Sequence, residues 1–349
     1  MKLKFKAAAA LFLALAMTGC ANDHYTKDGG EITTSVIQEI PPEETVTVTA
    51  EVTDIIPVTE STEETSSVPL MITDREGSDI FIPDEVNTIV SLSPIVTELL
   101  TGLGVSDRII AADSGSAAVE GADPAVCILS KSTITAEQLA SLGADVVITG
   151  GTSSAADNAQ LVLLRDMGVK VLFIPYSNSF SSIKLDIEFL AAYTGTAAKG
   201  KELVTEIDKA LLLNQASSPS AAAKTVYIET SPAPSMQTAG SGTLFGDILT
   251  LIGAGNIYAS QAGYIAADSA AVIEANPDVI ISNVHTADYD VNEISRRQGW
   301  NGIKAVADGR VYRTSSPIRP THKIIEYIED VRKLVYPELY AETASSPAE

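Results

Sequence analysis

Small and polar residues recur at the ends of predicted strands, and their chemistry suits the binding of a small molecule. In open α/β sheets, ligands bind beyond the carboxyl ends of the parallel strands. Two tyrosines can stack on a bulky ligand or simply pack, and an arginine can pair with an anionic group or form a structural ion pair. The candidate ligand contacts are Ser93, Pro94, Ser114, Gly150, Gly151, Tyr176, Ser231, Tyr264, His285 and Arg319.

Familiar catalytic motifs are missing from the sequence. It contains no G-x-S-x-G elbow, no P-loop and no H-E-x-x-H. The segment Gly102-Leu103-Gly104 closes a predicted helix and does not open one, which argues against a dinucleotide fingerprint. The three histidines, His24, His285 and His322, are widely separated, and no carboxylate spacing joins them into a metal site. We therefore predict neither an enzyme nor a resident metal or cofactor.

An internal repeat indicates which elements position these residues. Residues 88–94 match 225–232, 98–104 match 247–253, and 137–148 match 270–281, in the same order. Each half reads as a strand, a helix that ends at glycine, and a short helix that leads into an apolar strand. Two α/β units, each built around a mostly parallel sheet flanked by helices, are predicted.

Two further elements frame the repeat. A β-hairpin is predicted over residues 71–83, because two alternating apolar runs flank a turn that contains Asp74 and Gly77. Between the halves, residues 199–213 have apolar side chains at 203, 204, 207, 210 and 211, which is helical spacing. This helix is either another packed surface helix or a rigid connector between the two units.

The first twenty residues have the pattern of an export signal. Three lysines precede an apolar run over residues 7–19, and Cys20 follows. A helix of that length rises about 20 Å, which is short of the roughly 30 Å hydrocarbon core of a bilayer. Residues 16–20, Ala-Met-Thr-Gly-Cys, resemble a bacterial lipobox. We expect a lipid on Cys20 that holds the protein on the extracytoplasmic face of the cell membrane; the alternative is an ordinary cleaved signal with an incidental cysteine.

Charge separates the next segment from the rest of the chain. Residues 21–69 hold eleven acidic residues and one lysine among many Thr, Ser and Pro, a composition typical of a disordered linker. The whole chain carries −22; the signal contributes +3 and the linker −10, which leaves −15 for residues 70–349. This negative charge argues against nucleic acid as a partner. It is compatible with a partner whose docking surface is cationic.

A second cysteine, Cys127, lies in the apolar run 125–129. An odd thiol in an exported protein can pair between molecules, but the apolar surroundings favour a buried, inert side chain. No disulfide framework is possible if Cys20 is acylated, so the hydrophobic core must stabilise the fold.

Taken together, the motifs resemble those of the substrate-binding proteins of iron-complex and vitamin B12 ABC importers. The resemblance covers about residues 70–340 and includes the leader. The matching segments are Thr73-Asp74, 89–94 with Thr97-Glu98, 137–148, 277–281, 300–306 with 309–312, Arg319-Pro320 and 336–338. It implies two α/β lobes joined by one long helix, with the ligand held between them.

The resemblance also implies partners and their docking residues. Proteins of this family dock onto a permease through one glutamate of each lobe, and the matching N-lobe residue is Glu137. The matching C-lobe residue is Ala270, so Asp268 or Glu274 substitutes or docking is asymmetric. The implied partners are the ABC permease with its ATPase, the membrane through the lipid, and a ferric siderophore, haem or corrinoid; we expect a monomer.

Three other interpretations stay open at this point: a receptor for a metal ion or another small solute, an extracytoplasmic enzyme, and a structural surface protein. The first lacks a histidine cluster and the second lacks a visible nucleophile–base pair. The predicted organisation is a signal peptide (1–20), a disordered acidic linker (21–69), an N-terminal lobe (70–180), a connector with the interlobe helix (181–218), a C-terminal lobe (219–340) and a disordered tail (341–349).

Overall fold

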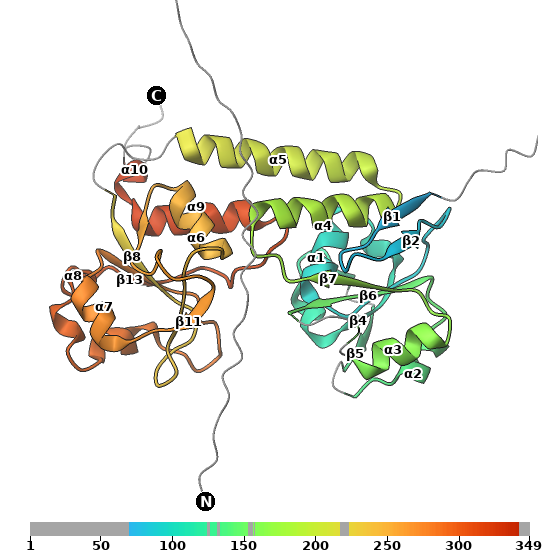
Figure 1. Ribbon diagram of the computed structural model, residues 1–349, viewed down its shortest axis with the longest axis horizontal. Helices are drawn as coiled ribbons and strands as arrows, with labels where there is room; N and C mark the ends of the chain where they lie inside the picture. Colours follow the sequence, from blue (N-terminus) through green and yellow to red (C-terminus); the bar gives the residue numbers. More distant parts are fainter. Residues whose placement is uncertain are drawn as a thin grey trace, which may run out of the picture. The chain divides into compact units, whose positions relative to one another are not determined.

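The computed structural model describes residues 70–123, 126–130, 133–152, 156, 158–216 and 223–341. The predicted signal peptide, the lipid site at Cys20, the acidic linker and residues 342–349 lie outside these ranges. The described chain forms two α/β lobes (Figure 1), as the repeat predicts. In these ranges, no helix combines the length and apolarity that crossing a membrane requires.

The N-terminal lobe is built on a five-stranded parallel sheet with the order β5-β4-β3-β6-β7. Its strands are β3 (Ile89–Ser91), β4 (Ile109–Asp113), β5 (Cys127–Leu129), β6 (Val146–Gly151) and β7 (Val171–Pro175). Its helices are α1 (Pro94–Gly102), α2 (Ala136–Ser141), α3 (Ala159–Asp166) and α4 (Phe180–Tyr193). Each helix follows a strand, so the parallel connections place the carboxyl ends of all the strands at one edge.

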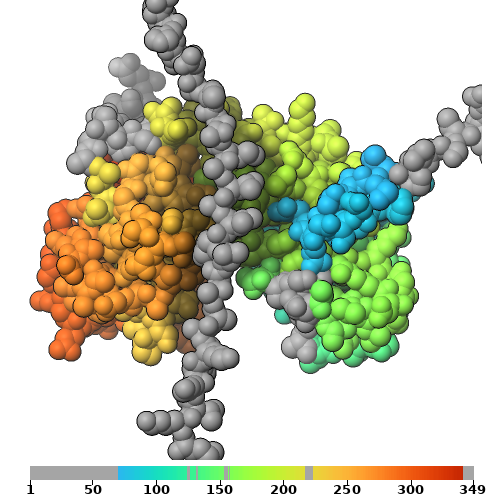
Figure 2. All heavy atoms as spheres, in the orientation of Figure 1, coloured from blue at the N-terminus to red at the C-terminus, as the bar shows by residue number. Residues whose placement is uncertain are grey.

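The predicted hairpin precedes this sheet. β1 (Met71–Thr73) and β2 (Asp79–Phe81) pair antiparallel around a turn in which Gly77 has a φ of 87°. The Asp74 carboxylate accepts hydrogen bonds from the Glu76 and Ser78 amides inside this turn. The hairpin is seen in blue on the surface of the N-terminal lobe (Figure 2).

The C-terminal lobe repeats the plan with a four-stranded parallel sheet, ordered β10-β8-β12-β13. Its strands are β8 (Thr225–Glu229), β10 (Gly255–Asn256), β12 (Val279–Ser282) and β13 (Val311–Arg313), and β9 (Gln237–Ala239) pairs antiparallel with β11 (Tyr264–Ala266) beside them. Its helices are α6 (Leu244–Leu251), α7 (Ser269–Ala275), α8 (Lys304–Ala307), α9 (Ile324–Val335) and α10 (Glu338–Ala341).

The repeat extends to individual hydrogen bonds. In the N-terminal lobe, one oxygen of Asp145 accepts bonds from the amide and the hydroxyl of Thr88, at 2.9 and 3.0 Å. In the C-terminal lobe, one oxygen of Asp278 accepts the same two bonds from Thr225, at 2.8 and 3.0 Å. Each pair, which we call a threonine–aspartate clasp, joins the starts of two neighbouring parallel strands.

Helix α5 (Ala197–Ala216) connects the lobes and has twenty residues. It packs against α4 of the first lobe and against α6 and α9 of the second. Leu203 and Ile207 of α5 are buried in a single apolar cluster that also contains Leu99 and Ile328. One core therefore runs from the inner face of one sheet to the inner face of the other, and the helix predicted over 199–213 is the connector.

The prediction of a buried thiol at Cys127 is wrong, because the side chain is exposed. Its strand, β5, is the edge strand of the sheet and pairs only with β4. An edge strand lacks a neighbour on one side, and here only Leu129 turns fully into the core. An apolar run such as 125–129 does not show whether its strand lies at the edge or in the centre of a sheet.

Candidate ligand-binding site

Two adjoining hollows lie between the lobes, near the carboxyl ends of the strands. Together we call them the cleft. The first has a volume of about 300 Å³ and the second about 490 Å³. Thr152 and Tyr176 of the N-terminal lobe and Tyr264 of the C-terminal lobe line both. The remaining residues of the first hollow come from the C-terminal lobe and are Thr230, Gln237, Phe245, Asn283 and Ile318.

Both lobes contribute aromatic side chains to the cleft. Tyr264 is 48% exposed, and its ring meets Phe245 edge to face with centroids 6.3 Å apart. Phe245 makes the same kind of contact with Tyr327, at 6.2 Å. Burial and the neighbouring Tyr264 raise the pKa of the Tyr176 hydroxyl to about 12. The phenols are therefore neutral at physiological pH and can offer both ring surface and hydrogen bonds to a ligand.

The charged groups beside the cleft already have partners. Arg75, which lines the second hollow, donates at 2.5 Å to Asp186, whose side chain is 1% exposed. Burial raises the pKa of the Asp186 carboxyl, and this effect outweighs the hydrogen bonds from Ser177 and Arg75, which lower it. Glu76 pairs with Arg165 at 3.2 Å. Every other residue lining the two hollows is uncharged, so the cleft presents a neutral, aromatic and amide-bearing surface.

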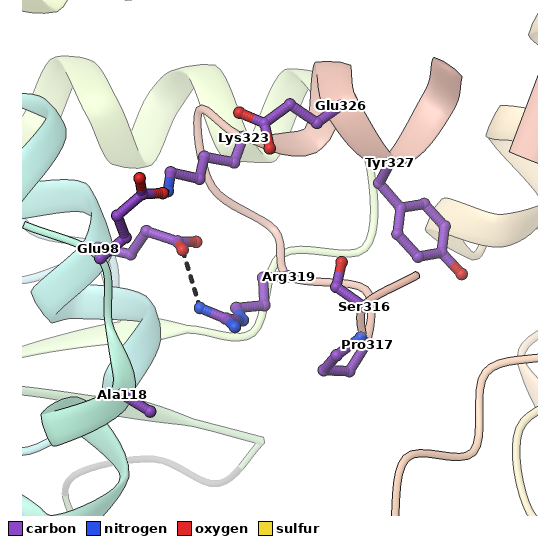
Figure 3. A pocket seen from close by; sticks show the side chains of 9 residues that line it. Glu98, Ala118, Ser316, Pro317, Arg319, Lys323, Glu326 and Tyr327 are labelled. Carbon is purple, nitrogen blue, oxygen red and sulfur yellow. Dashed lines mark hydrogen bonds and ion pairs between the residues drawn. The ribbon is translucent and has the colours of Figure 1, made fainter. Parts of the chain in front are cut away.

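A separate hollow of about 200 Å³ carries the charges that join the lobes (Figure 3). Glu98 of α1 is 3% exposed and accepts bonds from Arg319 at 2.8 Å and from Thr321 at 2.6 Å. The ring of His322 lies against Gly102, one turn further along α1. We call Glu98, Gly102, Arg319, Thr321 and His322 the interlobe joint.

The geometry of the cleft and the joint can be set beside known proteins. Residues 89–317, more than half of the chain, match the family model of periplasmic binding proteins. The chain belongs to this family. The resemblance predicted from the motifs is thereby confirmed, and the family consists of solute-binding components of transporters, not of enzymes.

Three relatives illustrate the similarity. An uncharacterised ABC transporter substrate-binding lipoprotein of Bacillus subtilis strain 168, YvrC, is 28% identical over 80% of this chain and 90% of its own length. A vitamin B12-binding protein of Vibrio parahaemolyticus is 23% identical over 71% of this chain and 89% of its own. The crystal structure of a possible iron-binding, periplasmic solute-binding protein of Staphylococcus epidermidis has a TM-score of 0.65 and 25% identity, covering 72% of this chain and all of that one.

Within this binding protein, the structure brings together some of the residues predicted from sequence. Gly151, Tyr176 and Tyr264 line the cleft, where Tyr176 and Tyr264 come from opposite lobes. Arg319 lies in the interlobe joint, and its ion-pair partner Glu98 is on the other lobe. The structural ion pair considered for Arg319 therefore exists, but it is not local in sequence.

The remaining predicted contacts are not among the residues lining the cleft. Ser93 and Pro94 begin α1, and Ser93 is buried. A β-carbon added at Gly150 would lie 2.7 Å from the carbonyl oxygen of Ile174, so this glycine permits close approach of two strands. The others have local roles: Ser114 opens a 3₁₀ turn, Ser231 bridges to Gln237, and Nε2 of His285 lies 3.0 Å from the hydroxyl of Thr314.

For some cleft residues, the sequence prediction chose a neighbour one or two positions further along the chain. Thr152, Thr230 and Asn283 each come directly after the last residue of a parallel strand, β6, β8 and β12. The sequence predicts that the stretch 282–285, which contains Asn283, lines this edge, but His285 was chosen from it as the ligand contact, and Ser231 was chosen one residue after Thr230. The signal was present, since ligands of open α/β sheets bind just beyond the carboxyl ends of the strands. Phe245 and Gln237 carried no comparable signal.

The described residues contain no cluster of three His, Cys, Asp or Glu side chains that could hold a metal ion. The predicted docking residues are at the surface. Glu137 is in the first turn of α2, where its own amide and Thr135 lower the pKa of its carboxyl. Asp268 caps the start of α7 by accepting from the amide of Ala270, and Glu274 is exposed near the end of that helix.

Proposed function

We propose that this protein is the lipid-anchored receptor of an ABC importer, which captures a large metal chelate between its lobes and delivers it to a membrane permease. The observation that carries the proposal is the cleft, to which both lobes contribute neutral aromatic and polar side chains. Family membership and the similarity to a substrate-binding lipoprotein support it. An importer receptor needs a site that both lobes complete, and the shared Tyr176 and Tyr264 supply one.

Among ferric siderophores, haem and corrinoids, the lining of the cleft favours a corrinoid. The propionates of haem and the anionic groups of many siderophores call for an available cation. The one cation lining the two hollows, Arg75, is already paired with Asp186. A corrinoid presents a broad ring and neutral peripheral amides, which match tyrosine faces and the side chains of Gln237 and Asn283. A neutral ferric hydroxamate is the second candidate for the same reason.

The test is calorimetric titration of the detergent-solubilised full-length protein with cyanocobalamin, dicyanocobinamide, haemin, a ferric hydroxamate and a ferric tricatecholate. We expect saturable 1:1 binding that is tightest for a corrinoid. Binding of haemin or the tricatecholate alone would overturn the corrinoid preference and keep the receptor role. If none of the five binds, the receptor proposal for metal chelates fails.

Docking is proposed to use Glu137 of the N-terminal lobe, which is exposed and charged at neutral pH. Reversing this charge with Glu137→Lys should reduce uptake by whole cells while chelate affinity in solution is unchanged. Glu274→Lys in the repeat-related helix α7 is the matched variant, and its effect distinguishes two-point from one-point docking. A loss of chelate affinity in Glu137→Lys would contradict a docking role.

The lipid on Cys20 is proposed to retain the receptor at the membrane, with the acidic linker as a tether. A flexible chain of 49 residues has a root-mean-square span of roughly 40 Å, and mutual repulsion of its charges extends it. The tether would keep the receptor at a high effective concentration near its permease. The variant Cys20→Ala should appear in the soluble fraction with chelate binding preserved, and its retention in the membrane fraction would refute the lipid.

A further inference from the structure

Asn283 is the only amide side chain in the first hollow whose oxygen is held by several donors within the described part of the chain. It comes directly after β12 and lines the hollow. Its Oδ1 accepts hydrogen bonds from the Tyr327 hydroxyl at 2.9 Å, the Ile318 amide at 2.9 Å and the Thr314 hydroxyl at 3.4 Å. The three donors come from α9 and from the segment 314–318 that follows β13, and they converge on one atom.

The Ile318 amide determines which way the Asn283 amide is turned. A backbone N–H can only donate, so the side-chain atom opposite it must be the oxygen and not the nitrogen. The reverse orientation would place the Nδ2 hydrogens against that N–H and leave a donor unsatisfied, at a cost of about 1–3 kcal/mol. The side chain cannot flip to suit a different ligand without that loss.

The nitrogen of this amide is left for another partner. Among the described residues, none accepts a hydrogen bond from Nδ2 of Asn283, and this atom is not one of the buried polar atoms that lack partners. Nδ2 is therefore accessible, and it belongs to a residue that lines the first hollow. In the same wall, the Thr230 hydroxyl also lacks a partner within the described residues.

We propose that Asn283 is a specificity-determining residue, whose oriented Nδ2 donates to an acceptor oxygen of a neutral ligand, such as the carbonyl of a peripheral amide. The proposal rests on the proposed function of the cleft. A site built to donate at one point rejects ligands that lack the acceptor, because the donor then stays unpaired. Tyr327, Thr314 and the Ile318 amide are positioning groups, since they act through Asn283.

The test replaces the donor with an acceptor of nearly the same shape. In Asn283→Asp, one oxygen can keep the three donors while the other faces the ligand. We expect the affinity for dicyanocobinamide at pH 7 to fall at least tenfold. The far-ultraviolet circular dichroism of chelate-free N283D should match that of the wild type, whereas general structural damage would change it.

The matched control is Asn178→Asp. Asn178 lines the second hollow and is exposed, so this variant adds the same charge to the cleft without removing an oriented donor. Any loss of affinity in N178D measures the effect of a negative charge in the cleft, and the loss in N283D should exceed it several-fold. If N283D does not fold, Tyr327→Phe keeps Asn283 and removes one orienting bond, and its affinity should fall by a smaller factor.

The outcomes separate this inference from the function on which it rests. If the wild type binds the chelate and N283D binds it with the same affinity, the role of Asn283 is overturned and the receptor proposal stays intact. Equal losses in N283D and N178D would also overturn it, because the effect would then be one of charge alone. If the wild type binds another of the five chelates instead of dicyanocobinamide, the same comparison is made with that chelate; binding of none refutes both proposals.

Discussion

At the scale of single residues, Gly102 shows how one missing side chain sets the contact between the lobes. A β-carbon at this position of α1 would lie 2.4 Å from Cε1 of His322 in the C-terminal lobe. Overpacking of this kind costs about 1–3 kcal/mol, whereas alanine in place of glycine within a helix gains roughly 0.5–1 kcal/mol. We therefore expect Gly102→Ala to lower the free energy of unfolding by about 1 kcal/mol, measured by urea denaturation.

A double-mutant cycle isolates this contact. His322→Ala removes the ring, so adding Gly102→Ala to it should be neutral or stabilising, through the helix propensity of alanine. The contact would be refuted if Gly102→Ala alone were as stable as the wild type. It would also be refuted if the two substitutions destabilised the protein additively.

The residue scale is also where prediction from sequence was least accurate. Tyr176 and Tyr264 were predicted because their chemistry is recognisable at a strand end or in a loop. Thr230 was missed, and His285 was chosen in place of Asn283 within the stretch 282–285, because the last residue of a strand cannot be located to within one position from an apolar run. The partnership of Glu98 with Arg319 joins residues 221 positions apart, and no local pattern encodes it.

At the scale of elements, prediction succeeded because the signals are local and occur twice. Glycines at Gly104 and Gly253 end the repeated helices with φ values of 78° and 73°, a conformation that favours glycine. Apolar runs of four residues or more became buried strands in both lobes. The prediction at Cys127 failed although its apolar run spans residues 125–129, because an apolar run does not show whether its strand has one neighbour in the sheet or two.

The threonine–aspartate clasps predict a matched dependence on pH. The amides of Asn87 and Thr88 lower the pKa of the Asp145 carboxyl. For Asp278, burial acts to raise the pKa, but bonds from Lys304 and Thr225 outweigh it and the pKa is lowered. A carboxyl whose pKa is lower in the folded state stabilises the fold above its ordinary pKa, and this stability is lost as the pH falls through the folded value.

Asp278→Asn should therefore lower the free energy of unfolding at pH 7 by about 1–2 kcal/mol, and Asp145→Asn should lower it by less. Asp145 is the more exposed, and Lys170 acts on it only through its charge, whereas Lys304 forms an ion pair with Asp278. The difference in stability between each variant and the wild type, measured by thermal unfolding, should disappear as the pH is lowered from 7 to 3. A gap that stays constant over this range would show that the charge of the clasp contributes nothing.

At the scale of the whole molecule, the lobes are joined in two different ways. Helix α5 extends a common apolar core from one lobe to the other, with Leu203 and Ile207 fully within it. The interlobe joint adds polar contacts on a different surface, between α1 and residues 319–322 (Figure 3). The connector could be predicted from its helical spacing. The joint could not, because no local sequence pattern marks residues that meet only when the two lobes pack together.

Two ion pairs that join the lobes within the described residues provide a test of how the joint holds. Arg319 pairs with Glu98, which is 3% exposed, whereas Lys323 pairs with Glu120, which is 88% exposed. Removing the partner of a buried charge costs about 1–3 kcal/mol, but an exposed ion pair contributes little. Arg319→Ala should therefore lower the free energy of unfolding by about 1–3 kcal/mol, while Lys323→Ala should leave it unchanged within error.

The variant Arg319→Ala also decides between the two roles considered for Arg319. If the guanidinium acts through the joint, Arg319→Ala loses stability in the absence of any chelate, and the loss is largely removed when Glu98→Gln is introduced first, because no buried charge is then left unpaired. If it acts as a ligand contact, chelate affinity falls and stability without chelate is unchanged. The 2.8 Å bond across the lobes leads us to expect the first result, by urea denaturation of the chelate-free protein.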